Sequence, residues 1–308
     1  MFRKLETPCV SNAGNSLRIH HCQTAEVPIT TMTDALILYH AECDDGFGAA
    51  YAAWLSLGDS AEYQPVTYGE RVASSRLTGR KVFILDFSFP PDLLGDMAQH
   101  AAKIVLLDHH KSAAAQWTHI EPASNVELHF DMDRSGAQMA WDYFHADSAR
   151  PPLIDHIGDR DLWRFTMADT KAFCAGLSLI PTSFESWQGA AAHPEALITK
   201  GRTVLEVLQR QIDSALRKEL RPVTLCGHQG LATNAISNTS ELGQAIAKRS
   251  GTFSLTFFIK GDEAICSLRS IAPFDVSTIA TYYGGGGHAQ ASGFSVPIER
   301  FFREIWNG

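Results

Sequence analysis

Acidic and imidazole side chains follow three short apolar segments in the first half of the sequence. The apolar runs 35–39, 82–86 and 104–108 each end in, or are followed by, a His or an Asp. The candidate ligands of this region are His40, Asp44, Asp45, Asp86, Asp108, His109, His110, Asp155, Asp159 and Asp161. Carboxylates and imidazoles without clustered thiolates suit Mn²⁺, Mg²⁺, Zn²⁺ or Fe²⁺. The sequence therefore predicts chemistry that depends on divalent metal ions.

The elements that must position these residues are predicted to be parallel strands. The three runs are apolar throughout, as in strands buried on both faces, and helix-like segments separate them. In open α/β sheets, ligands bind at the carboxyl ends of the strands, so His40, Asp86 and residues 108–110 should meet in one crevice. A single Asp after a strand is more commonly a helix cap or turn residue. Three such strand ends together favour the site.

Two metal ions about 3.5–4 Å apart need a shared carboxylate. Asp86 stands alone at the end of the expected central strand and is the best candidate for that bridge. The triplet 108–110 directly follows a strand, so its side chains should alternate in direction. His109 and one neighbour can then face the ions while the other neighbour supports them.

The motifs around these residues resemble those of the DHH/DHHA1 phosphoesterase superfamily, in family order, from about residue 36 to 294. That superfamily takes its name from an Asp-His-His triplet. The matching segments are HAECDDGFGA at 40–49, a strand ending in Asp86, LDHHK at 107–111, IGDRDLW at 157–163 and the glycine-rich run with a His at 284–293.

The resemblance implies two bound divalent ions, Mn²⁺ first, with Mg²⁺ or another ion as the alternative. It implies His40 and Asp86 as ligands of one ion, and Asp45, Asp86, His109 and Asp159 as ligands of the other. Asp108 and His110 would take catalytic supporting roles, with His110 near the leaving group. The family's first motif usually reads Asp-x-Asp, but here Cys43 stands at the first Asp when Asp45 is aligned with the second. Whether Cys43 or Asp44 takes that ligand position stays open.

The second half of the chain offers groups that can bind an anion. Consecutive glycines, among them Gly285, Gly286 and Gly287, allow backbone amides to approach a phosphate, and His288 adds a donor. Arg269, on an expected strand, presents a planar fork that suits a phosphate. The resemblance assigns the glycine segment to substrate recognition, although a glycine run taken alone is commonly a flexible loop. The aromatic residues Trp141, Trp163 and Phe165 are expected to pack in the core.

The length of 308 residues suggests two domains. We expect an α/β fold in which an N-terminal parallel-sheet DHH domain is joined by a helical linker to a smaller α+β DHHA1 domain. Residues 1–31 lack periodicity and are predicted to be a disordered extension or to precede the natural start. The predicted ranges are 32–190 for the metal-binding domain, 191–222 for the linker and 223–308 for the substrate-binding domain.

Composition limits the partners and the compartment. The formal charge of -8, from 26 basic and 34 acidic residues, argues against the broad basic surface that grips a long duplex. No apolar stretch approaches the roughly 18 residues that a membrane span needs. Six scattered cysteines without a CxxC pair, and no apolar leader segment, predict a cytoplasmic protein with reduced thiols. The sequence leaves a homodimer open.

The resulting expectation is a hydrolase that cleaves phosphate esters with metal-activated water. The expected substrates are short oligonucleotides, linear or cyclic dinucleotides, or nucleoside bisphosphates, and the activity could be that of a 3′–5′ exonuclease. One alternative is an inorganic pyrophosphatase or exopolyphosphatase. Another is a regulatory nucleotide-binding protein with reduced catalysis, for which the altered motif at Cys43 is the sequence support.

Overall fold

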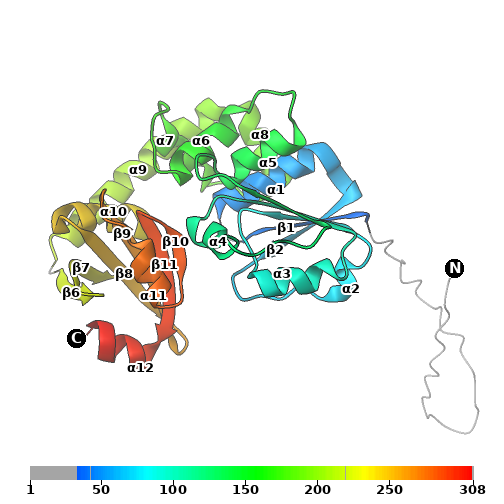
Figure 1. Cartoon of the computed structure of the whole chain (residues 1–308). Coiled ribbons are helices and arrows are strands. Elements are labelled where there is room, and N and C mark those ends of the chain that lie inside the picture. The colour runs from blue at the N-terminus through cyan, green and yellow to red at the C-terminus, as the bar shows by residue number, and fades with distance from the viewer. Residues whose placement is uncertain (1–32, 42, 219, 307–308) are drawn as a thin grey trace, which may run out of the picture.

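The computed structural model describes residues 33–41, 43–218 and 220–306. Within these ranges the chain forms two domains, each built on its own sheet, and the long helix α9 (Pro194–Leu216) runs between them (Figure 1). The predicted extension 1–31 lies outside the described residues.

The first domain is built on a parallel five-stranded sheet in the order β2-β1-β3-β4-β5. The strands are β1 (Ala35–His40), β2 (Ala61–Val66), β3 (Lys81–Leu85), β4 (Lys103–Asp108) and β5 (Val126–Phe130). The three strands expected from apolar runs are the inner ones. The sequence analysis missed β2 and β5, which lie at the sheet edges and carry more exposed polar residues, so they lack a continuous apolar run.

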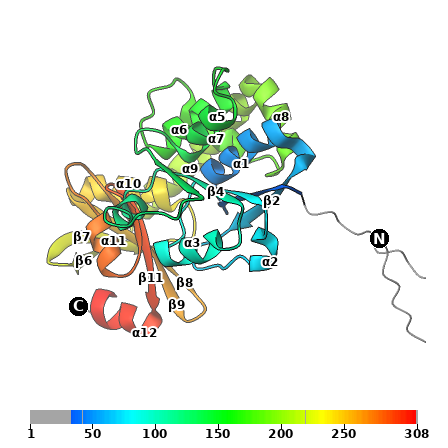
Figure 2. The same cartoon turned by 45° about the vertical axis from the view of Figure 1, so that its right-hand side comes forward.

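Helices cover both faces of this sheet, as parallel strands require (Figure 2). The helices of this domain are α1 (Asp44–Leu57), α2 (Ser74–Leu77), α3 (Pro91–Ala98), α4 (Lys111–Gln116), α5 (Gly136–Phe144), α6 (Pro152–Asp161), α7 (Thr170–Leu177) and α8 (Phe184–Ala192). A short 3₁₀ turn, Gly58–Ser60, follows α1.

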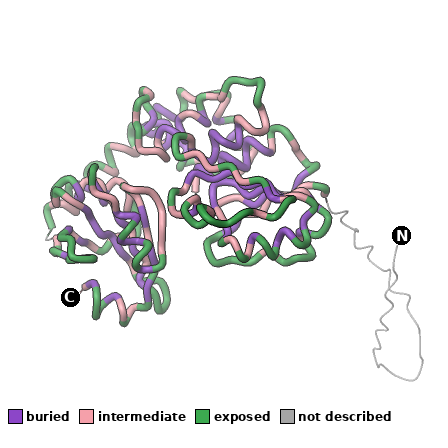
Figure 3. The backbone as a smooth tube through the Cα atoms, in the orientation of Figure 1, coloured by how far each residue is buried: buried purple, intermediate pink, exposed green. Residues whose placement is uncertain are grey.

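The core of this domain consists of two apolar layers, one on each face of the sheet (Figure 3). Because strand side chains alternate, Ile37 packs with α1, α5 and α6 on one face, while Leu36 and Leu38 pack with α3 on the other. Both layers are buried, so the strand ends have little freedom to move relative to one another.

The second domain has a mixed six-stranded sheet in the order β10-β11-β9-β8-β7-β6, in which only β7 and β8 are parallel neighbours among the described strands. Its strands are β6 (Arg221–Leu225), β7 (His228–Asn234), β8 (Phe253–Lys260), β9 (Glu263–Ser270), β10 (Gly286–His288) and β11 (Ala291–Pro297). Its helices are α10 (Thr239–Ser250), α11 (Ser277–Tyr282) and α12 (Ile298–Arg300), followed by a π-helical segment, Phe301–Trp306. The expected α/β fold class, with a smaller α+β second domain, is confirmed.

The long connecting helix ends earlier than its sequence pattern suggests. The predicted helical linker extends to residue 222, but α9 ends at Leu216, and Arg221 and Pro222 begin β6. Strand β6 lies at the edge of its sheet, where a proline without an N–H is tolerated. Among the described helices, none is long and apolar enough to cross a membrane.

The two domains touch across the carboxyl edge of the first sheet. Lys111 Nζ lies 2.9 Å from Asp275 Oδ2, and the Gly287 amide donates to Ser112 Oγ at 3.2 Å. Arg160 at the end of α6 lies 3.1 Å from a carboxylate oxygen of Glu241 on α10. These contacts place β10 beside α4 (Figure 1).

Helix α9 is seated on α7 through a glycine, which generates a testable prediction. A Cβ added at Gly201 would clash with the backbone carbonyl of Ala172. We expect Gly201→Ala to lower the free energy of unfolding by about 1–3 kcal/mol, because a packed backbone contact must open. The measurement is the midpoint of denaturant unfolding.

The matched control is Gly189→Ala in α8, where an added Cβ meets no atom within 4 Å. There the change should be neutral or stabilising by up to about 1 kcal/mol, because Ala favours a helix over Gly. Equal effects of the two substitutions would contradict this account of the α7 and α9 contact.

Candidate metal centre and substrate cleft

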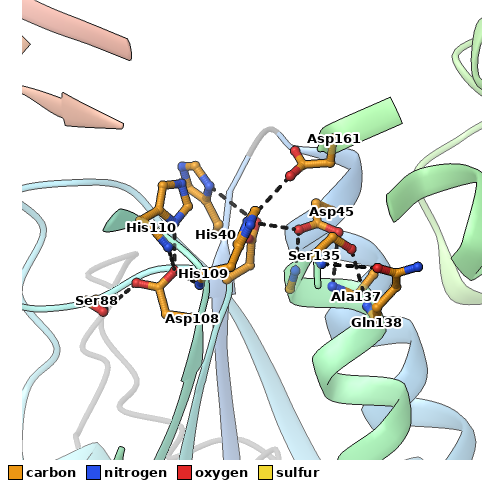
Figure 4. A network of polar contacts seen from close by, with 12 residues as sticks. His40, Asp45, Ser88, Asp108, His109, His110, Ser135, Ala137, Gln138 and Asp161 are labelled. Carbon is orange, nitrogen blue, oxygen red and sulfur yellow. Dashed lines mark hydrogen bonds and ion pairs between the residues drawn. The ribbon is translucent and has the colours of Figure 1, made fainter. Parts of the chain in front are cut away.

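The candidate ligands lie at the carboxyl edge of the first sheet (Figure 4). His40 ends β1, Asp86 directly follows β3, and the triplet 108–110 spans the end of β4. Asp45 stands in the first turn of α1 and Asp161 is the last residue of α6. The geometry is that expected for ligand sites of open α/β sheets.

Asp45 is held by the N-terminus of α5. Its two carboxylate oxygens accept hydrogen bonds from the amides of Gly136 at 2.6 Å and Ala137 at 3.0 Å. The same helix end is closed by a capping box between Ser135 and Gln138. The positive end of the helix dipole favours a negative charge on Asp45. The N-terminus of α5 thus holds the Asp45 carboxylate in the site, next to the residues at the strand ends.

Asp86 occupies the centre of the cluster with a left-handed backbone (φ 64°) and a side chain that is 1% exposed. Its Oδ1 lies 3.0 Å from His109 Nε2, while Oδ2 lies 3.6 Å from His40 Nδ1. Burial alone would raise the pKa of Asp86, but the hydrogen bond to His109, the nearby His40 and the imidazolium charges outweigh it and hold this pKa well below its usual range. An added Cβ at Gly136 would clash with Asp86, so glycine is needed there.

His109 is surrounded by carboxylates. Its Nε2 lies 3.0 Å from Asp86, 3.4 Å from Asp45 and 3.5 Å from Asp161. Burial lowers the pKa of His109, but the hydrogen bond to Asp86 and the charges of Asp161 and Asp45 outweigh it and raise the pKa to about 10. Burial and repulsion from Asp86 and Asp161 raise the pKa of Asp45 well above its usual range. Without bound cations, protons on Asp45 and His109 therefore offset part of the negative charge of the carboxylates.

Asp108 faces away from this group and supports the neighbouring imidazole. Its Oδ1 accepts from the His109 amide at 2.8 Å and lies 2.6 Å from His110 Nδ1, and its Oδ2 accepts from Ser88 Oγ at 2.5 Å. With the proton assigned to Nδ1, Nε2 of His110 is left for the cleft. Burial lowers the pKa of His110, but the Asp108 carboxylate outweighs it and raises this pKa above its usual value.

These residues fit divalent cations because their buried polar atoms lack protein partners. Among the described residues, seven buried side-chain nitrogen or oxygen atoms have no hydrogen-bond partner, and four belong to this cluster: His40 Nδ1, Asp86 Oδ2, His109 Nδ1 and Asp161 Oδ2. Burying such atoms unpaired is costly, and one imidazole cannot neutralise three carboxylates. Cations would satisfy the oxygens. Among the described residues, four donor groups could hold an ion. Two of them do not involve His110: Asp45 with His109 and Asp161, and His40 with Cys43 and Asp86.

Asp159, an expected metal ligand, does not reach the cluster. Its carboxylate accepts from the Thr166 amide and hydroxyl at 2.8 Å each, from the Met167 amide at 3.1 Å and from Thr170 Oγ1 at 2.6 Å. It thereby closes the turn after α6. Residues two apart on a helix point to nearly opposite sides. Asp161, one of the ten candidates, therefore faces His109 where Asp159 cannot.

Asp44 also lies outside both donor groups. Its Oδ2 is 3.4 Å from Arg160 Nη1, on the side of α1 that faces α6. Of the other candidates, Asp155 pairs with Arg150 at 3.7 Å outside the cluster. The cluster brings together His40, Asp45, Asp86, Asp108, His109 and His110 as described above.

A cleft of about 1220 Å³ separates the cluster from the second domain. His288 lies across it, with its ring 4.8 Å from the rings of both His109 and His110, and stacked on the latter. Arg269 also lines the cleft. Its two terminal nitrogens donate to Leu268 O at 2.8 Å and Ser240 Oγ at 2.7 Å, while its buried Nε has no partner.

The glycine segment differs from the expected open, anion-binding loop. Gly286–His288 forms strand β10, paired with β11. The amides of Gly284, Gly285 and Gly287 already donate to Thr281 O, Ala280 O and Ser112 Oγ. A Cβ at Gly285 would clash with Gly293 O, and one at Gly286 would lie 2.7 Å from Ser112 Oγ. In this structure the glycines allow neighbouring strands, and the two domains, to approach each other closely.

Two aromatic residues of the cleft were missed or misplaced by the sequence analysis. Tyr68, in the loop after β2, is 62% exposed and lies edge-on to His40 with ring centroids 5.2 Å apart. Because β2 was not predicted, nothing marked the residue after it as lying at the carboxyl edge. Trp163, expected in the core, is half-buried and lines the cleft beside Phe165, whereas Trp141 is buried as expected.

Comparison with known proteins finds no matching family model. The chain is 28% identical over 285 residues to the uncharacterized protein R106 of Acanthamoeba polyphaga mimivirus, covering 84% of this chain and 67% of that protein. It is 25% identical over 291 residues to the oligoribonuclease NrnB of Bacillus subtilis, covering 85% of this chain and 73% of that protein. Among solved structures, RecJ of Thermus thermophilus in complex with Mn²⁺ is 14% identical with a TM-score of 0.48, over 87% of this chain and 50% of RecJ.

The parallel sheet with His and Asp at its carboxyl edge, followed by a mixed-sheet second domain, defines a two-domain α/β protein with its candidate site at the strand ends. The ordered motifs, together with the 25% identity to the NrnB protein, support the resemblance to the DHH/DHHA1 phosphoesterase superfamily that the sequence shows.

Because Asp159 and Asp161 have different surroundings, the same Asp→Asn substitution should have a different effect at each of the two positions. Asp161→Asn should weaken binding of divalent ions by at least about 10-fold, with little loss of stability, because it removes one of the carboxylates around His109. Asp159→Asn should cost about 1–3 kcal/mol of stability, because an amide group would face donors. Calorimetric metal titration and denaturant unfolding measure the two effects. Loss of metal affinity in Asp159→Asn, together with loss of stability in Asp161→Asn, would instead support Asp159 as the ligand.

The raised pKa of His109 predicts proton release on metal binding. At pH 8 the metal-free imidazole is protonated, because its pKa is about 10, and a metal ligand must be neutral. Affinity should therefore rise between about pH 7 and pH 9. Titration calorimetry in buffers of different ionisation enthalpy should show protons released in the wild type and fewer in His109→Gln. Binding heats that do not depend on the buffer would contradict the assigned charge state.

Proposed function

We propose that this protein is a divalent-metal-dependent phosphodiesterase that hydrolyses short oligonucleotides and dinucleotides. One observation carries the proposal: three carboxylates converge on His109 at the floor of a cleft whose opposite wall carries an arginine and a histidine. The similarity to the NrnB protein, named an oligoribonuclease, supports the same class of substrate.

The proposed ligand sets follow from the donor groups. His40 and Asp86 would hold one ion, and Asp45, Asp86, His109 and Asp161 the other, with Asp86 shared. Hard oxygen and imidazole donors suit Mn²⁺ or Mg²⁺ at the second position. When bound, the ions lower the pKa of water and neutralise charge on the phosphate. The residues of the chain provide binding, orientation and proton handling.

His110 is placed to handle the leaving-group proton. Asp108 holds its Nδ1, so that Nε2 faces the cleft in a defined orientation, and Ser88 in turn holds Asp108. A general acid needs such orientation within hydrogen-bond reach of the substrate. Asp108 acts through His110 and is therefore a positioning residue.

His288 and Arg269 would bind the phosphate from the second domain. Burial and repulsion from the charged His110 and His109 lower the pKa of His288 to about 3. His288 is therefore neutral near pH 7 and can donate one hydrogen bond without a charge. Arg269 lines the cleft and brings a permanent positive charge, while its Nε is buried without a partner. The neutral imidazole and the cation together can hold a terminal phosphate while the ions engage the scissile one.

The cleft suits a short substrate. Its volume of about 1220 Å³ is somewhat larger than the roughly 300–1,000 Å³ of sites for drug-sized ligands. The closing contacts Lys111–Asp275 and Arg160–Glu241 limit the space for a long polymer. The formal charge of -8 disfavours a long duplex. Linear dinucleotides fit these limits, and cyclic dinucleotides and nucleoside bisphosphates belong to the same chemical class.

The test is a product assay with purified protein loaded with Mn²⁺. The panel contains a diribonucleotide, a cyclic dinucleotide, a nucleoside bisphosphate, pyrophosphate, polyphosphate and a long RNA duplex. We expect mononucleotide products from the diribonucleotide, complete loss with a chelator, and a fall in kcat of more than about 100-fold in Asp86→Asn. Circular dichroism of that variant controls for folding.

Each alternative has its own signature in this assay. Hydrolysis of pyrophosphate or polyphosphate alone would replace the proposal by a pyrophosphatase or exopolyphosphatase. Nucleotide binding by calorimetry without any product would make the protein a regulatory binding module. Full activity of Asp86→Asn would reject the metal centre itself.

A further inference from the structure

The position of Cys43 separates it from the neighbouring acid in the first motif. Asp44 pairs with Arg160 at 3.4 Å and belongs to neither donor group. Cys43, the N-cap residue of α1, places its sulfur with His40 and Asp86 so that the three ligand atoms all lie within 4.8 Å of one another. The structure thus distinguishes the two residues that the sequence left open.

Two further atoms at this place lack protein partners. Asp86 Oδ2 is buried without a hydrogen bond, although the Asp86 side chain is almost wholly enclosed, and the buried His40 Nδ1 is also unpaired. Ligand bonds of about 2.0–2.3 Å put the donors of one ion no more than about 4.6 Å apart. A small adjustment of the three groups would meet that limit. The donors come from the end of β1, the start of α1 and the end of β3.

We propose that Cys43 is a thiolate ligand of the ion held by His40 and Asp86, and that this position prefers a thiophilic divalent cation over Mg²⁺. The inference rests on the proposed metal-dependent function and specifies one of its two ion positions. A thiolate favours Zn²⁺ and similar thiophilic cations over hard cations more strongly than carboxylates and imidazoles do. As the sulfur–metal bond forms, the S–H bond breaks and its proton passes to solvent.

The two ion positions are therefore chemically unequal. Asp45, His109 and Asp161 supply oxygen and nitrogen atoms only. His40, Cys43 and Asp86 supply one nitrogen, one sulfur and one oxygen. At limiting metal, a thiophilic ion should enter the sulfur-containing position first, while Mn²⁺ or Mg²⁺ fills the other.

Cobalt provides a readout that does not depend on activity. Wild-type protein titrated with Co²⁺ should show the near-ultraviolet charge-transfer band of a sulfur–cobalt bond. Cys43→Ser and Cys43→Asp should lose this band. The matched control is Cys226→Ser, because Cys226 is an exposed thiol outside the cleft. It should keep the band at full intensity.

Competition between ions gives the second measurement. Cys43→Asp should still bind two ions per chain, but its preference for Zn²⁺ over Mn²⁺ at the first position should fall by at least about 10-fold. In wild-type protein, Zn²⁺ should also protect Cys43 from alkylation, as measured by mass spectrometry of its peptide. This last experiment needs no variant and therefore does not depend on how a substituted protein folds.

The outcomes separate this inference from the proposed function. Two cobalt ions bound without the band, a band that persists in Cys43→Ser, or alkylation of Cys43 unaffected by Zn²⁺ would each overturn the thiolate ligand and leave the metal-dependent hydrolase standing. Absence of any metal binding would overturn both.

Discussion

The structure depends on holding several carboxylates of like charge in one buried place. Asp45, Asp86 and Asp161 all approach His109 Nε2 within 3.5 Å, and together they carry more negative charge than one imidazole can neutralise. Such a group is stable only with protons or cations among its members. The shifted pKa values of Asp45 and His109 express the first solution. The proposed metal ions would provide the cations. The rest of the fold holds the carboxylates so close together that either protons or cations are needed among them.

Rigid elements oppose the mutual repulsion of these side chains. Parallel strands packed on both faces fix the positions of His40, Asp86 and Asp108, while α5 binds Asp45 through two amides. Gly136 lets that helix end approach Asp86 without a clash. The second domain meets this edge through the Gly287 amide on Ser112 and the stacked ring of His288 on His110. A phosphate held between the domains would thus lie between a cluster built to accept cations and a wall that carries an arginine.

Much of this arrangement could be predicted from the sequence, and the failures have definite causes. The inner strands were recognisable because burial on both faces demands continuous apolar runs, and His40, Asp86 and His109 follow those runs directly. Edge strands β2 and β5 have mixed patterns and were missed. The contacts favour Asp161 over the expected Asp159 as the residue facing His109, because two residues apart on α6 their side chains point to nearly opposite sides.

By itself, the sequence determined the kinds of ligand available, the order of the motifs and the α/β class, because these follow from residue types and hydrophobic patterning along the chain. Only the tertiary structure decided which donors meet. Asp44 turns to Arg160 while Cys43 turns to His40 and Asp86, and the glycine run becomes a strand whose amides are already bonded. Residues that are neighbours in the sequence can point their side chains in different directions. Which direction each side chain takes is decided by packing between elements that are distant along the chain.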